Sequence, residues 1–172
     1  MIKQADNKII KIETMNYFFK TVLLIDDNEI DNIIDKMIIV KNKFAETIIV
    51  KQSSEEAIDF LRNDSVATNQ IPDLIFLDIR MPMMDCFEFL EIYKDLPKEI
   101  IEKTKIVVLT SSLDDKDYAQ AMENRFVKFL LNKPLSFEAL ENLRRISEVV
   151  KNRKVIKEES MANNVTHSRR VK

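Results

Sequence analysis

The chain has 172 residues, of which 45% are apolar and 33% are charged, and its formal net charge is −2. This length suits one domain with a core, and no apolar run reaches the ~20 residues of a membrane span. A single cysteine excludes an internal disulfide framework, and the absence of glycine excludes glycine-rich phosphate-binding loops. The first residues are too polar for a signal peptide, so we expect a cytoplasmic protein without membrane attachment.

Predicted strands and helices alternate in the first half of the chain. The apolar run at 21–25 predicts a buried strand, and residues 28–40 have helical periodicity. That helix carries apolar residues on one face, which we expect in the core: Ile30, Ile33, Ile34, Met37 and Ile38. The elements expected next are a strand at 46–50, a helix from Ser53 or Ser54 to Arg62, a loop at 63–70, a strand at 73–77 and a helix at 83–94.

The second half of the chain continues this alternation. The connection at 94–104 is long enough for an extra turn, and it leads into a strand at 105–109. We then expect a helix at 114–123, a strand at 126–131 and a last helix that starts at Ser136 and buries Phe137, Leu140, Leu143, Ile146 and Val150. Five strand and helix pairs in series predict an α/β fold, a doubly wound five-stranded parallel sheet with five helices.

The predicted domain lies between two polar ends. We assign residues 20–150 to the domain, 1–19 to an N-terminal extension, and 151–172 to a basic tail into which the last helix could continue. The tail has seven basic and two acidic residues, so it carries +5 and the first 150 residues carry −7. Short charged ends are usually solvated, so we predict no nucleic-acid binding. The tail is too short to form a core of its own.

Polar side chains follow four of the predicted strands and offer three carboxylates, a hydroxyl and an ammonium group. They are Asp26 and Asp27, Asp78, Thr110 and Lys133. Because the carboxyl ends of parallel strands meet at one edge of a sheet, we expect these side chains in one crevice. Three clustered carboxylates repel one another unless they share a hard cation, and Mg²⁺ bound by carboxylates, waters and phosphate oxygens meets that need. The sequence therefore predicts a phosphoryl site that uses Mg²⁺.

Four segments carry a family resemblance. In this order and at these separations, LLIDDNE, LIFLDIRMPMMD, VVLTSS and LLNKPL resemble the receiver domain of two-component response regulators, in particular its stand-alone, chemotaxis-type members. The resemblance covers about residues 20–150. It implies a flavodoxin-like sheet with strand order 2-1-3-4-5. It also implies a signalling protein and not an enzyme, since a receiver catalyses only its own aspartyl phosphorylation and dephosphorylation.

The resemblance assigns roles to the strand-end residues. Asp78 matches the phosphoacceptor, a carboxylate that attacks phosphorus. Asp27 matches the direct Mg²⁺ ligand and Asp26 its water-mediated neighbour, while Asp78 and the backbone carbonyl of Arg80 complete the protein's share of the metal ligands. Lys133 matches the lysine that pairs with the phosphate.

Other positions match the family or depart from it. Thr110 matches the hydroxyl that turns inward to a phosphoryl oxygen, and Lys133–Pro134 is expected to be a cis peptide. Cys86 stands where the family usually has glycine, so the turn before it must form without a positive φ or with modest strain. Leu130 stands at the switch position that is usually Tyr or Phe, so the aromatic switch lacks its ring.

The function that the resemblance implies is phosphorylation-dependent signalling. A histidine kinase or histidine phosphotransfer protein would donate the phosphoryl group to Asp78. Output would pass to a downstream protein, or through a homodimer formed by the helix at 114–123, the fifth strand and the last helix. One alternative is a haloacid-dehalogenase-like phosphatase, which needs a second acid where this chain has Arg80. The other is a phosphorylation-independent pseudo-receiver scaffold, against which the complete acidic set argues.

Overall fold

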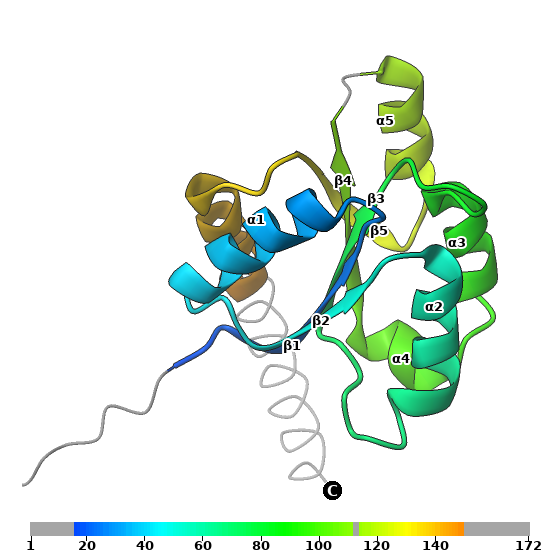
Figure 1. The fold of residues 1–172 in the computed structure, drawn as a ribbon, viewed down its shortest axis with the longest axis horizontal. Helices are drawn as coiled ribbons and strands as arrows, with labels where there is room; N and C mark the ends of the chain where they lie inside the picture. Colours follow the sequence, from blue (N-terminus) through cyan, green and yellow to red (C-terminus); the bar gives the residue numbers. More distant parts are fainter. Residues whose placement is uncertain (1–15, 112–113, 150–172) are drawn as a thin grey trace, which may run out of the picture.

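The computed structural model describes residues 16–111 and 114–149, and the structural statements below refer to these residues (Figure 1). Its centre is a five-stranded sheet in the order β2-β1-β3-β4-β5, in which each neighbouring pair of strands is parallel. The strands are β1 (Phe19–Ile25), β2 (Ala45–Lys51), β3 (Leu74–Asp78), β4 (Lys105–Thr110) and β5 (Val127–Asn132). The predicted doubly wound fold and its strand order are confirmed.

Helices cover both faces of the sheet (Figure 1). One face carries α1 (Glu29–Lys41) and the helix at 137–149. The other face carries α2 (Ser54–Asp59), the π-helical turn η1 (Phe60–Asp64), α3 (Cys86–Tyr93), α4 (Lys98–Lys103) and α5 (Asp115–Glu123). The prediction of five helices missed α4 as a helix, although it expected an extra turn in that connection.

Strand alternation divides the core into two layers. Leu23 and Leu77 point toward α2, α3 and α4, whereas Leu24 and Phe76 point toward α1 and the helix at 137–149. All five residues of β3 are buried, because a central strand of a parallel sheet is covered on both faces. Burial of each of its four apolar side chains contributes roughly 1.5–3 kcal/mol, whereas burial of the Asp78 carboxylate at its end is unfavourable. No helix of the described residues is long and apolar enough to cross a bilayer.

The predicted orientation of α1 is wrong. Of the five apolar residues expected in the core, four are solvent-exposed and Ile38 alone packs partly against it. The buried residues of α1 are Asn32, Asp35 and Ile39. Asn32 donates a hydrogen bond to the backbone carbonyl of Asp26, and Asp35 accepts one from the backbone N–H of Leu135. These bonds satisfy loop backbone groups that would otherwise be buried without partners, and this requirement decides which face of the helix turns inward.

The last helix also differs from its prediction. Ser136 caps it as expected, through a hydrogen bond from the Ala139 N–H. Leu140 and Leu143 are buried, but Phe137 and Ile146 are 63% and 42% exposed, so the predicted buried face was too wide. Val150, residues 1–15 of the N-terminal extension and the tail at 151–172 lie outside the described residues, and the predicted domain boundaries stay predictions.

Candidate functional site

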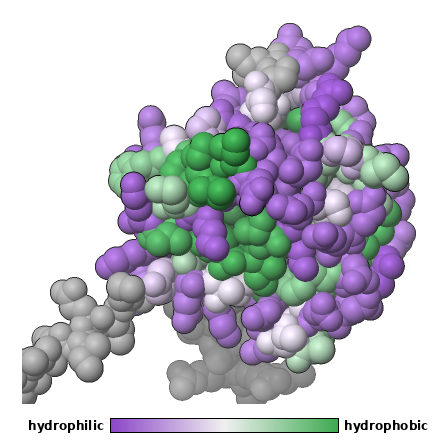
Figure 2. Space-filling view, in the orientation of Figure 1, coloured by the Kyte–Doolittle hydropathy of each residue, from purple (hydrophilic) through white to green (hydrophobic). Residues whose placement is uncertain are grey.

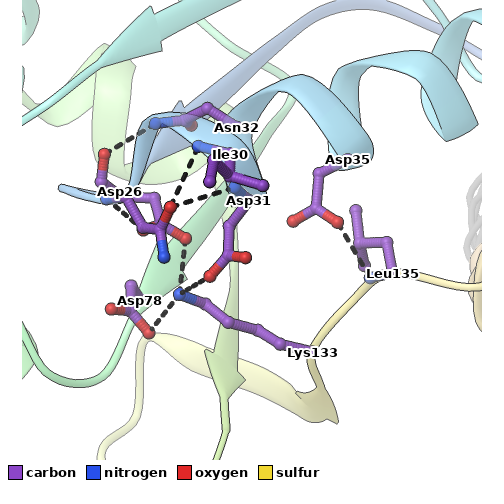
Figure 3. Close-up of polar contacts among 9 residues, drawn as sticks. Asp26, Ile30, Asp31, Asn32, Asp35, Asp78, Lys133 and Leu135 are labelled. Atoms are coloured by element: carbon purple, nitrogen blue, oxygen red, sulfur yellow. Dashed lines mark hydrogen bonds and ion pairs between the residues drawn. The ribbon is translucent and has the colours of Figure 1, made fainter.

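The predicted strand-end residues meet at the carboxyl edge of the sheet. Asp26 follows β1, Asp78 ends β3, Thr110 ends β4 and Lys133 follows β5. The register aligns Asp78 with Leu109 on β4, and Thr110 with Asn132 on β5, so these strand ends are neighbours in space. Figure 3 shows Asp26, Asp78 and Lys133 directed toward one another.

Three carboxylates can share a cation here. Asp26, Asp27 and Asp78 each offer one oxygen, and these oxygens all lie within 4.8 Å of one another. Asp26 and Asp78 are buried, whereas Asp27 is exposed to solvent. An oxygen-only set that combines buried carboxylates with access to water suits Mg²⁺, which binds oxygen ligands and usually keeps several waters.

Lys133 links the acidic residues of three elements (Figure 3). Its Nζ lies 2.6 Å from Asp26 Oδ2, 2.9 Å from Asp78 Oδ1 and 3.3 Å from Asp31 Oδ2. Burial acts to lower the pKa of this ammonium group, but bonds to Asp26 and Asp78 outweigh it, and the net pKa lies above that of an ordinary lysine. Lys133 is therefore a fixed positive charge beside the carboxyl group of Asp78.

Opposing effects set the pKa of the Asp78 carboxyl group. Burial raises its pKa to about 6 and is the largest influence, while the hydrogen bond and the charge of Lys133 act in the opposite direction. The neighbouring Asp26 adds to the increase. Above about pH 6 the carboxylate form, the nucleophilic form, predominates, and a bound divalent cation would extend that form to lower pH.

The segment that leads into α1 is held by side chains that the sequence analysis did not single out. Asp26 Oδ1 accepts a hydrogen bond from the Asn28 N–H at 2.9 Å. Asn28 caps α1 by accepting from the N–H groups of Ile30 and Asp31. Together with the bond from Asn32 Nδ2 to the Asp26 carbonyl, 2.7 Å long, these contacts hold Asp26 in place.

Asp35 connects α1 to the loop that carries Lys133. Its Oδ1 accepts the Leu135 N–H at 2.9 Å, in a position where the Asp35 side chain is almost fully buried (Figure 3). Burial raises the pKa of Asp35 to about 6. The sequence held a signal for this residue: Asn28, Asn32 and Asp35 recur at intervals of four and three, the spacing of one helix face.

The loop between β3 and α3 brings the Arg80 side chain to α5. Arg80 Nη2 and Nε lie 2.5 Å and 3.1 Å from Asp117 Oδ2 of α5, and the Arg80 side chain is 68% exposed. The guanidinium group is therefore bound to α5. The role predicted for the Arg80 carbonyl as a metal ligand stays a prediction.

The turn into α3 forms without a positive φ at Cys86. Met83 takes the left-handed conformation, with φ of 68°, and α3 begins at Cys86 rather than at Met83. Asp85 caps α3 in a reciprocal capping box with Glu88. Cys86 is fully buried and burial raises the pKa of its thiol, so it is a packing residue. A left-handed residue other than glycine costs roughly 1–2 kcal/mol, which the cap offsets in part.

Two further predictions concern β5 and the loop that follows it. The Lys133–Pro134 peptide is cis, as expected. Leu130, at the switch position, is half-buried and packs against the core layer under α2, α3 and α4. It also borders a small hollow together with Thr110 and Tyr118.

Comparison with known proteins agrees with this geometry. The family model of the response regulator receiver domain matches residues 22–145. The chain is 31% identical over 128 residues to the probable methanogenesis regulatory protein FilR2 of Methanothrix harundinacea, a match that covers 74% of this chain and 79% of that protein. Several other curated relatives are matched over only part of their length.

Solved structures show the same likeness. A two-component response regulator from Cytophaga hutchinsonii superposes with a TM-score of 0.70 at 33% identity, covering 77% of this chain and 98% of that one. A response regulator receiver protein from Dyadobacter fermentans gives a TM-score of 0.64 at 30% identity, covering 72% and 94%. The chain belongs to the response regulator receiver family, and this membership argues against the haloacid-dehalogenase-like alternative.

Proposed function

We propose that this chain is a phosphorylation-dependent receiver that accepts a phosphoryl group on Asp78 from the phosphohistidine of a histidine kinase or a histidine phosphotransfer protein. The observation that supports this most directly is the pairing of Asp78 with Lys133 at 2.9 Å beside two further carboxylates. A nucleophile, a fixed cation and a set of metal ligands are the parts that phosphoryl transfer to a carboxylate requires.

The chain's own residues have distinct roles in this transfer. A carboxylate oxygen of Asp78 attacks phosphorus in line with the P–N bond, that bond breaks, and its electron pair leaves with the imidazole of the donor. Lys133 can bond a phosphoryl oxygen while it keeps its contact with Asp26. The hydroxyl of Thr110 would donate to another oxygen. Mg²⁺, held by Asp26, Asp27, Asp78 and the Arg80 carbonyl, would neutralise charge on the phosphoryl group.

Output would pass through protein contacts. The Arg80–Asp117 ion pair joins the loop after the phosphoacceptor to α5, so a change at the site can reach this helix without an aromatic switch. A downstream protein partner, or a homodimer through α5, β5 and the last helix, stays a prediction. We place the chain in the cytoplasm, with neither nucleic acid nor membrane as its partner.

Phosphorylation with a small donor tests the proposal. The protein is incubated with acetyl phosphate and Mg²⁺, and the acid-labile, hydroxylamine-sensitive label is measured. We expect label on the wild type, its loss on addition of EDTA, and its loss in Asp78→Asn. Asp95→Asn, a change at an exposed carboxylate outside the acidic cluster, is the matched control and should label normally. Equal labelling of Asp78→Asn would reject the assignment of the phosphoacceptor, and an unlabelled wild type would favour the pseudo-receiver scaffold.

A further inference from the structure

The solvent side of α1 carries an apolar surface that the site does not use. We call it the α1 stripe; its residues are Ile30, Ile33, Ile34, Met37 and Val40, which are 68%, 53%, 37%, 52% and 55% exposed. Figure 2 shows hydrophobic side chains gathered over this helix among polar surroundings. Contiguous exposed apolar patches on folded proteins mark contact surfaces, whereas single exposed apolar residues do not.

The spacing of the α1 stripe fits a second helix. Its residues recur at intervals of three and four, the pattern of a seam between two packed helices. At 1.5 Å per residue, the segment from Ile30 to Val40 provides a seam of about 15 Å. A groove beside it is lined by Ile33, Lys36, Met37, Val40 and Lys41. This geometry favours a second amphipathic helix as the occupant of the groove.

Charges along α1 indicate the direction in which a partner helix would run. Glu29 lies in the first turn, Lys41 lies in the last turn, and Lys36 borders the stripe. All three are exposed, and within residues 16–111 and 114–149 no ion pair is recorded for them. An antiparallel partner with the same sequence would place its basic residues beside Glu29, whereas a parallel one would place like charges together.

We propose that α1 pairs with α1 of a second copy of this chain, antiparallel and about a twofold axis. In the register that matches both the stripe and the charges, Ile30 lies opposite Val40 of the second copy, and Ile33 lies opposite Met37. Glu29 then lies opposite Lys41 of the second copy, and the symmetry forms the same pair twice. A twofold contact needs only one self-complementary patch, and the α1 stripe has this property.

This contact is distinct from the homodimer expected through α5, β5 and the last helix. On that surface Phe126 and Leu130 pack partly against the core, which leaves Tyr118 and Met122 as the large exposed apolar residues of α5. The α1 pairing does not depend on phosphorylation of Asp78. It can therefore be tested on the full chain without any phosphodonor, and a failure of the proposed phosphorylation would leave it unaffected.

Analytical ultracentrifugation of the full chain in EDTA, at tens to hundreds of micromolar, provides the first test, because an interface of this small size binds weakly. We expect a reversible monomer and dimer equilibrium. Met37→Glu should weaken association by about tenfold or more, since a buried charge at the seam has no partner. Met122→Glu, the same change at an exposed methionine of α5, should leave it unchanged. Circular dichroism is used to check that each variant is folded.

A charge exchange provides the second test. Glu29→Lys and Lys41→Glu should each weaken the dimer, and the double variant should recover most of the wild-type association, because the ion pairs re-form with reversed polarity. A wild type that stays monomeric throughout would overturn the proposal and leave a different helical protein as the occupant. Loss of the dimer in Met122→Glu but not in Met37→Glu would overturn it in favour of the α5 surface.

Discussion

Asp35 is a buried carboxyl group that should make the stability of the protein depend on pH. Folding raises its pKa from 3.8 to about 6, chiefly because burial disfavours the charged form. A group whose pKa is raised by folding stabilises the native state below its unfolded pKa, and this contribution is lost as the pH rises through the folded value. Above about pH 6 the protein therefore keeps a costly buried charge.

The Asp35→Asn substitution removes this cost while it keeps an oxygen that can accept the Leu135 N–H. A shift of about two units at 1.36 kcal/mol per unit corresponds to roughly 3 kcal/mol. We expect the two proteins to differ by no more than about 1 kcal/mol at about pH 4, the net value of one hydrogen bond. The variant should then gain on the wild type between about pH 4 and pH 6, and be more stable by about 2–3 kcal/mol at pH 7.

Urea unfolding, followed by circular dichroism at a series of pH values in EDTA, measures this difference. Other titrating groups change the stability of both proteins, so the informative quantity is the variant's free energy of unfolding minus that of the wild type. Asp95→Asn, the same change at an exposed site, is the matched control and should show no gain in stability comparable to that of Asp35→Asn. A pH-independent difference for Asp35→Asn, or a variant less stable than the wild type at pH 7, would refute the reasoning.

Four further predictions concern the site and the fold. Arg80→Ala should shorten the lifetime of the aspartyl phosphate several-fold, because a guanidinium group can shield the phosphoryl group; an unchanged or longer lifetime would contradict this. Asp117→Asn should lengthen that lifetime, since Asp117 binds the guanidinium group in the structure; loss of label over time measures both. Deletion of residues 1–14 should leave the melting temperature within about 2 °C, and a larger loss would mean that this segment docks. Phe89→Ala, at a fully buried ring of α3, should cost about 3–5 kcal/mol in urea unfolding, and a cost under about 1 kcal/mol would argue against this packing.

The site could be predicted from the sequence because its residues come directly after strands. A buried parallel strand appears as a continuous apolar run, so its end is visible as the first polar residue, and the fold brings all such ends to one edge. Asp26, Asp78, Thr110 and Lys133 were found in this way. Their roles came from the family resemblance, since spacing alone does not distinguish a nucleophile from a metal ligand.

Contacts between distant segments could not be predicted in the same way. Asp31 and Lys133 are 102 residues apart, and the Arg80–Asp117 pair joins a loop to a helix 37 residues further on. No local sequence pattern indicates either pair, because all four residues are of polar types that are usually solvated. Their positions follow from how the loops pack above the sheet.

The sequence by itself predicted a helix at 28–40, close to the observed α1, but only the tertiary structure decided which side of it is buried. Periodicity identifies a face rich in Ile and Met, and burial of apolar area alone would turn that face inward. Asn32 and Asp35 face inward instead, since the backbone groups of Asp26 and Leu135 need hydrogen-bond partners where no water reaches them. The structure pairs those groups with Asn32 and Asp35 and leaves the α1 stripe on the solvent side of the helix.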